Sequence, residues 1–146
     1  MTDLRRDRPV RITILSIFIF CFAAWNGLRL GEAIYFWKTI AEFNASPLYI
    51  SISGAAWLIT GLLLFWGLWQ GKAWGWVAAI SGTAGYTIWY WLDRLILQEH
   101  HANWPFVLIS QIIYLPIIYS ILLSPRTKRY FKRGVDERKP KTPTPA

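Results

Sequence analysis

The chain has 146 residues, of which 54% are hydrophobic and only 16% are charged. Soluble domains carry roughly a quarter charged residues, so this composition argues against a water-soluble fold. The formal net charge of +8 is better explained by membrane topology and anionic lipid headgroups than by a nucleic-acid partner, which we do not expect.

Four long apolar segments follow one another, at about 12–36, 48–69, 73–92 and 105–123. At about 1.5 Å per residue, a helix over each segment is long enough to cross a hydrocarbon core of about 30 Å. Helices are expected because lipid cannot satisfy free backbone groups, and no segment shows the period of two that a membrane barrel requires. The sequence therefore predicts an all-α fold, a four-helix transmembrane bundle over residues 12–123.

Basic residues gather on one side of these segments. Thirteen of the 16 Lys and Arg lie in the tails 1–11 and 124–146 or at Lys72, and only Arg29, Lys38 and Arg94 lie on the other side. By the positive-inside rule, both termini are expected on the cytoplasmic side of the membrane. No cleavage site follows the first apolar segment, so we expect a retained anchor and not a signal peptide.

The basic C-terminal tail is predicted to lie on the membrane surface. Aromatic residues Tyr130 and Phe131 stand among its cations, a pattern that suits a short interfacial segment on anionic lipid. The headgroup-binding candidates are Arg126, Lys128, Arg129, Lys132 and Arg133. The proline-rich end of the tail is predicted to be disordered.

Rows of small residues predict where helices approach closely. On the second segment the row is Gly54 and Gly61, and on the third the rows are Gly75, Ala79 and Thr83, Ala78 and Gly82, and Ser81 and Gly85. One interpretation is packing between these two segments, which the short turn at 70–72 makes neighbours. The alternative is contact with another subunit.

Four charged residues lie close to the ends of the first and third segments, away from the basic tails. They are candidates for ion pairing or for ion translocation, since charges near the membrane core are costly and normally pair. Arg29 and Glu32 are three residues apart on one helix face, and Asp93 and Arg94 end the third segment at a similar depth. Crossed pairing of Arg29 with Asp93 and of Glu32 with Arg94 would neutralise all four charges.

A metal site is a weaker hypothesis. Glu99, His100 and His101 are adjacent in the third loop, but transition metals need three or four converging ligands, so Glu32 or Asp93 would have to complete the set. The simpler interpretation is a solvated loop. The single cysteine, Cys21, excludes an internal disulfide and a cysteine-based zinc site. The sequence predicts no catalytic residue and no cofactor.

The hairpin GLWQGKAWGW at residues 67–76 resembles a hairpin of small, uncharacterised four-span bacterial membrane proteins. The matching positions are Gly67, Leu68, Trp69, Gly71, Lys72, Trp74 and Trp76. The resemblance implies a bacterial inner-membrane setting and no particular activity.

Three classes of function remain open from the sequence. The first is a non-enzymatic accessory or scaffold subunit, which predicts a membrane-protein partner. The second is a small transporter or channel that works as a homo-oligomer, because four helices enclose little pore. The third is a membrane enzyme that acts on lipid through Glu32, Asp93 and a histidine, although no nucleophile completes such a site.

Overall fold

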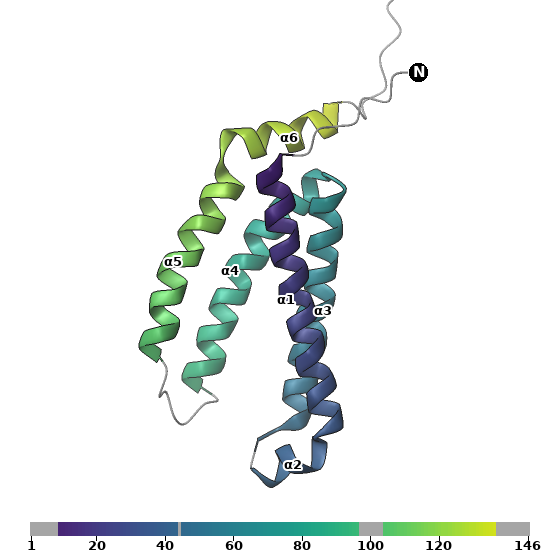
Figure 1. The fold of residues 1–146 in the computed structure, drawn as a ribbon, viewed down its shortest axis with the longest axis vertical. Helices are drawn as coiled ribbons and strands as arrows, with labels where there is room; N and C mark the ends of the chain where they lie inside the picture. Colours follow the sequence, from purple (N-terminus) through teal and green to yellow (C-terminus); the bar gives the residue numbers. More distant parts are fainter. Residues whose placement is uncertain (1–8, 44, 97–103, 137–146) are drawn as a thin grey trace, which may run out of the picture.

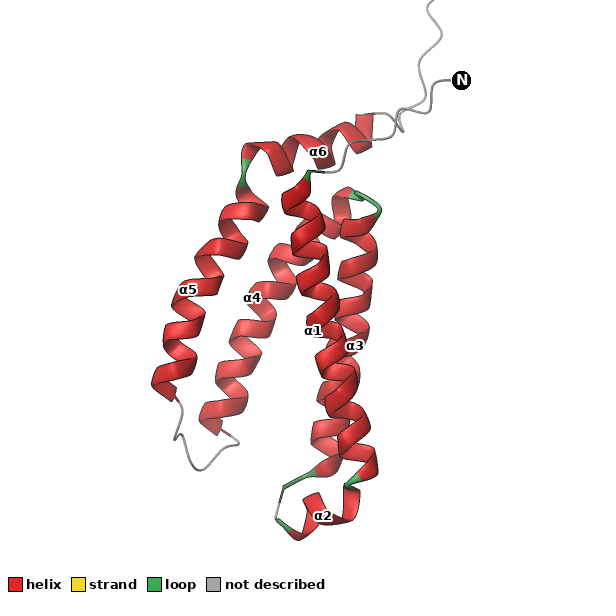
Figure 2. Cartoon of the chain, in the orientation of Figure 1, coloured by secondary structure: helices red, strands yellow, loops and turns green. Residues whose placement is uncertain are grey.

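A computed structural model describes residues 9–43, 45–96 and 104–136, with side chains to residue 132. These residues form six helices and no strand, which confirms the all-helical prediction (Figure 2). The helices are α1 (Val10–Tyr35), α2 (Trp37–Glu42), α3 (Pro47–Trp69), α4 (Ala73–Ile96), α5 (Trp104–Leu123) and α6 (Pro125–Asp136).

Three of these helices, α1, α3 and α5, are long and apolar enough to cross a membrane by length and composition. Helix α4 is as long, at 24 residues, but it is not among the helices that meet this criterion. Large apolar side chains such as Ile17, Phe18 and Ile112 are exposed on the surface of the long helices. Such a surface is typical of helices that face lipid.

Helix α1 packs along α3, and glycines on α3 permit this close approach (Figure 1). A Cβ atom added at Gly61 would lie 2.8 Å from the Cβ atom of Ala23, and one at Gly54 would lie 3.3 Å from the backbone oxygen of Asn26. The interpretation that Gly54 and Gly61 face the third segment is therefore wrong. Their shared face points to α1, while α4 packs against a different face of α3.

Helices α3 and α4 meet next to their connecting turn. A Cβ atom added at Gly75 would lie 2.5 Å from the backbone carbon of Gly67, so the two backbones touch here. The turn ends α3 with a Schellman motif: Lys72 N–H donates to Gly67 O, and Gly71 N–H donates to Leu68 O, both at 3.0 Å. Gly71 has a φ of 62°, a left-handed conformation that favours glycine.

Helix α6 crosses the end of the bundle where the N-terminus of α1 and the α3–α4 turn also lie (Figure 1). Its start is defined by Ser124, whose Oγ accepts a hydrogen bond from Thr127 N–H at 3.3 Å, and by Pro125 in the first helical position. The Thr127 hydroxyl also donates to the carbonyl of Ile121 at 2.7 Å, which ties α6 to the last turn of α5.

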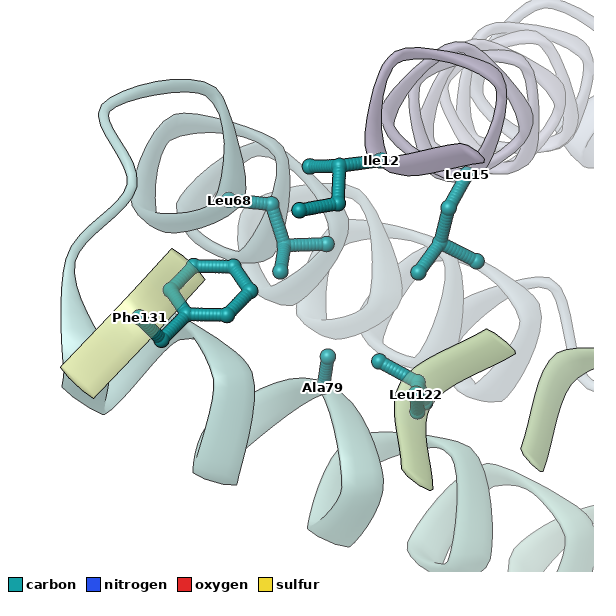
Figure 3. Packing of buried hydrophobic residues seen from close by; sticks show 6 residues of the cluster. All are labelled: Ile12, Leu15, Leu68, Ala79, Leu122 and Phe131. Carbon is teal, nitrogen blue, oxygen red and sulfur yellow. The ribbon is translucent and has the colours of Figure 1, made fainter. Parts of the chain in front are cut away.

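A cluster of buried apolar residues lies beneath α6 (Figure 3). It joins all the helices except α2 through Ile12, Leu15, Leu68, Ala79, Leu122 and Phe131. Phe131 is only 2% exposed, although the sequence interpretation placed it at a lipid interface. It is buried because α6 turns its apolar face onto the bundle and leaves Arg126, Lys128, Arg129 and Lys132 exposed.

Candidate functional site

The polar residues of interest lie at the end of α4 opposite α6 (Figure 1). Asp93 is held there by α3, because the hydroxyl of Tyr49 donates a hydrogen bond to its Oδ1 atom. Tyr49 is positioned by the first turn of α3, where Ser46 Oγ accepts from Tyr49 N–H at 3.3 Å and Pro47 follows in the first helical position. This contact ties the start of α3 to the end of α4.

Arg29 is part of the same neighbourhood from α1. Its positive charge acts electrostatically on the hydroxyls of Tyr49 and Tyr86, on which the charge of Asp93 also acts. Arg29 and Asp93 nevertheless do not form a direct ion pair within the described residues. The hydrogen bond from Tyr49 to Asp93 therefore ties α3 to α4, with the charge of Arg29 acting from α1.

The second crossed pair, Glu32 with Arg94, is also not formed within the described part of the chain. Glu32 is exposed, whereas Arg94 is only 9% exposed. The Nη1 atom of Arg94 donates to the hydroxyl of Tyr90 at 3.1 Å, one helical turn back on α4. The crossed pairing requires α1 to pack against α4, but α1 packs mainly on α3.

Aromatic side chains fill the space between α1, α3 and α4. Phe22, Trp57 and Tyr86 contact one another edge to face, with ring centroids 4.7–6.4 Å apart. Trp89 continues the cluster at 5.4 Å from Trp57. Edge-to-face rings stabilise helix contacts beyond their area alone, so this cluster orients the face of α4 that carries Tyr86 and Tyr90.

Helix α5 meets α4 through a polar contact and an adjoining cleft. The indole N–H of Trp91 donates to Oε1 of Gln111 at 2.5 Å, and Gln111 is itself buried. Beside this contact is a cleft of about 200 Å³ that is lined by Tyr86, Tyr90, Phe106, Val107, Ser110, Gln111 and Tyr114. Its walls are aromatic and aliphatic, and hydroxyl and amide groups line them at intervals.

The remaining predicted candidates are the possible metal ligands of the third loop and the headgroup-binding cations of the C-terminal segment. Glu99, His100 and His101 lie outside the described residues, and the described residues hold no group of three metal-ligating side chains. Four of the five predicted headgroup-binding cations are exposed on α6, and Arg133 belongs to the same helix. The structure thus separates the α6 cations from the Asp93–Arg94 region by the length of the bundle (Figure 1).

Sequence reasoning missed Tyr49, Tyr90 and the cleft between α4 and α5. Tyr90 and Arg94 are four residues apart, a spacing that places them on one helix face, so their contact was readable from the sequence. Tyr49 carried a weaker signal, since the Ser46-Pro47 cap fixes where α3 begins but not what lies opposite. The cleft carried none, because it depends on how α4 and α5 pack.

Comparison of the chain with protein-family models, with curated proteins and with solved structures found no match.

Proposed function

We propose that this chain is a four-span protein of a bacterial inner membrane, with both termini in the cytoplasm. We further propose that it acts as a non-enzymatic accessory or scaffold subunit of a membrane complex. The observation that carries the proposal is an exposed face of α4 with a hollow of small residues at its centre. Neither α3 nor α5 covers this face.

The connectivity supports α4 as the fourth span. In Figure 1, α4 runs antiparallel to both α3 and α5 and alongside them, and its 24 residues are about 36 Å long. Its mid-helix hydroxyls are satisfied within the helix, since Thr83 donates to Ala79 O and Thr87 to Thr83 O, both at 2.8 Å. Helix α4 joins the C-terminal end of α3 to the N-terminal end of α5, and these two ends lie on opposite sides of the bundle (Figure 1). Because α3 and α5 are both able to span, the helix that joins these ends spans as well.

The charge distribution supports the orientation. The end of the bundle that carries α6 also carries the α3–α4 turn with Lys72 (Figure 1). Thirteen of the 16 Lys and Arg belong to that end or to the tails that extend from it. An excess of Lys and Arg marks the cytoplasmic side.

The exposed face of α4 follows a spacing of three or four residues along the whole helix. Its members are Val77, Ser81, Gly85, Ile88, Leu92 and Leu95. A Cβ atom added at Gly85 would meet nothing within 4 Å, so the hollow at Ser81 and Gly85 is open. Small residues between larger ones let a second membrane helix approach closely, and we assign this hollow to a helix of a different membrane protein.

The other small-residue row on α4 is already occupied. Gly75 packs on Gly67, and Gly82 lies against Leu64, to whose Cδ1 atom an added Cβ would be 2.9 Å away. Both contacts are with α3. The small residues at Gly75 and Gly82 thus pack within the chain, whereas Ser81 and Gly85 lie on a different face of α4 that is available to another subunit.

The test is purification of the tagged chain from its native membrane in a mild detergent, followed by determination of the complex composition. We expect a stoichiometric different membrane protein with the wild-type chain and its loss with Gly85→Leu. Gly31→Leu is the matched control, because Gly31 on α1 is equally exposed and a Cβ there also meets nothing within 4 Å. Both variants are expected to keep wild-type helicity and thermal stability.

Crosslinking locates the partner on this face. The chain has one cysteine, Cys21, so Cys21→Ser gives a cysteine-free background in which Ser81→Cys or Gly31→Cys is the only thiol. We expect a crosslink to the partner from position 81 and none from position 31. A complex that contains only copies of this chain, or that survives Gly85→Leu, would contradict the proposal and favour a homo-oligomeric transporter.

A further inference from the structure

The cleft between α4 and α5 has a buried cation beside it that the proposed scaffold role does not use. Tyr90 lines the cleft, and its hydroxyl accepts the hydrogen bond from Arg94 Nη1 at 3.1 Å. Arg94 is 9% exposed, and its Nε atom is buried with no hydrogen-bond partner among the described residues.

A buried guanidinium without an anion is unfavourable. Arginine stays protonated in proteins, and a buried charge is normally paired or hydrogen-bonded on all its donors. Within the described residues no carboxylate forms an ion pair with Arg94, whose one side-chain hydrogen bond there goes to Tyr90. An anionic ligand at the guanidinium of Arg94 would offset this unfavourable burial of charge.

The position of Arg94 indicates what kind of anion this is. It lies near the end of α4 opposite α6, in the last turn of the helix, where a membrane helix meets the headgroup layer. The cleft extends from Tyr90 toward the middle of the helix, past Val107 and Ser110 to Tyr86 and Tyr114. A ligand that fits both parts has a charged head at the membrane surface and an apolar chain directed inward.

We propose that Arg94 and Tyr90 bind the phosphate of a phospholipid and that the cleft holds part of one of its acyl chains. The planar guanidinium matches phosphate oxygens with paired donors, and the Tyr90 hydroxyl provides a further polar contact. The cleft volume of about 200 Å³ is below the range of about 300–1,000 Å³ typical of sites that enclose a whole small molecule. It therefore suits a segment of one chain, with the rest of the lipid in the bilayer.

This site is independent of the cations on α6 and of the exposed face of α4. The cations of α6 lie at the other end of the bundle (Figure 1). The cleft residues of α4, Tyr86 and Tyr90, are partly buried, whereas Gly85 and Ile88 are exposed. Failure of either proposal would leave the other intact.

The experiment measures lipid binding to the purified full-length chain by native mass spectrometry. Phosphatidylglycerol is titrated into the delipidated protein, with wild type, Arg94→Gln and Lys38→Gln compared. Lys38 is the control because it is an exposed cation on the same side as Arg94. We expect Arg94→Gln to weaken the tightest binding step by about tenfold or more, as for loss of a charge-assisted hydrogen bond, and Lys38→Gln to leave it unchanged.

Two further ligands separate the contributions of head and chain. Diacylglycerol with the same acyl chains lacks the phosphate and is expected to bind at least tenfold more weakly, with no difference between wild type and Arg94→Gln. Inorganic phosphate lacks the chain and is expected not to raise the melting temperature at concentrations where phosphatidylglycerol does. Equal binding of diacylglycerol, or equal protection by inorganic phosphate, would overturn the proposal.

The stability of each variant in lipid-free detergent distinguishes a folding defect from a loss of lipid binding. Arg94→Gln is expected to be at least as stable as wild type in lipid-free detergent, because it removes a buried charge that lacks an anion, and phosphatidylglycerol should raise the melting temperature of wild type alone. A lipid-free variant less stable than wild type would instead identify Arg94 as structural. A second variant, Ser110→Leu, fills the cleft without touching Arg94 and is expected to weaken binding of phosphatidylglycerol as well.

Discussion

The contact between Gly67 and Gly75 makes a sharp prediction about how closely α3 and α4 must approach. In Gly75→Ala, the new Cβ atom would start 2.5 Å from the backbone carbon and 2.8 Å from the Cα and carbonyl oxygen of Gly67. Favourable carbon–carbon contacts begin at about 3.5 Å. The helices would have to separate by about 1 Å, because no flexible side chain is present to move aside.

The expected magnitude follows from comparison with an open glycine on the same helix. Overpacking a close contact costs about 1–3 kcal/mol, while replacing a helical glycine by alanine gains up to about 1 kcal/mol. Gly85→Ala gains the same helix propensity without a steric clash, since nothing lies within 4 Å of its Cβ position. Gly75→Ala should therefore be less stable than Gly85→Ala by about 1–3 kcal/mol.

The assay is reversible unfolding of both variants and the wild type in mixed micelles with increasing SDS, followed by far-ultraviolet circular dichroism. Both variants replace a helical glycine by alanine, so the helix-propensity contribution cancels when their unfolding free energies are subtracted. The remaining difference is the cost of the closer contact between α3 and α4. Equal stability of Gly75→Ala and Gly85→Ala would refute the close approach of α3 and α4 at their turn.

Three further variants test contacts elsewhere in the bundle. Phe131→Ala should lower the free energy of unfolding by about 3 kcal/mol or more by the usual loss for a buried aromatic, while Lys132→Ala, exposed on the same helix, should change it by less than about 0.5 kcal/mol. Tyr49→Phe removes the donor to Asp93 and should destabilise the chain by about 1.5–3 kcal/mol in the same unfolding assay; a neutral result would mean that this hydroxyl does not tie α3 to α4. Gly71→Ala places a side chain at φ 62° and should cost about 1–2 kcal/mol, measured as a lower midpoint of thermal unfolding, with an unchanged midpoint as the contrary outcome.

Helix α4 has three distinct faces, which explains why it is less apolar than its neighbours. One face packs on α3 through Gly75 and Gly82, and another faces α5 through Tyr86 and Tyr90. The third face is exposed around Gly85. A helix that packs against protein on two faces needs less hydrophobicity than one surrounded by lipid, which is consistent with the proposal that α4 is a fourth span.

The sequence alone predicted the four long helices α1, α3, α4 and α5, with bounds within four residues of those observed, but not the short helix α2. Long apolar segments leave only helices as spanning structures, and the capping patterns are local: Ser46-Pro47 begins α3, Gly71 ends it, and Ser124-Pro125 begins α6. The mixed apolar and basic character of α6 was also readable, because Tyr130 and Phe131 stand between pairs of cations in its sequence. These features depend on residues within a few positions of one another.

Only the tertiary structure decided which faces meet. The crossed ion pairs of Arg29 and Glu32 are not among the contacts of the described residues, in which Asp93 accepts from Tyr49 and Arg94 donates to Tyr90. Gly54 and Gly61 face α1, because the sequence does not state which helix lies against α3. Phe131 was read as lipid-facing for the same reason. In a bilayer, lipid-facing and bundle-facing side chains are both apolar, so hydrophobic patterning does not distinguish them, and the partners of Asp93 and Arg94 emerge only when the helices are packed.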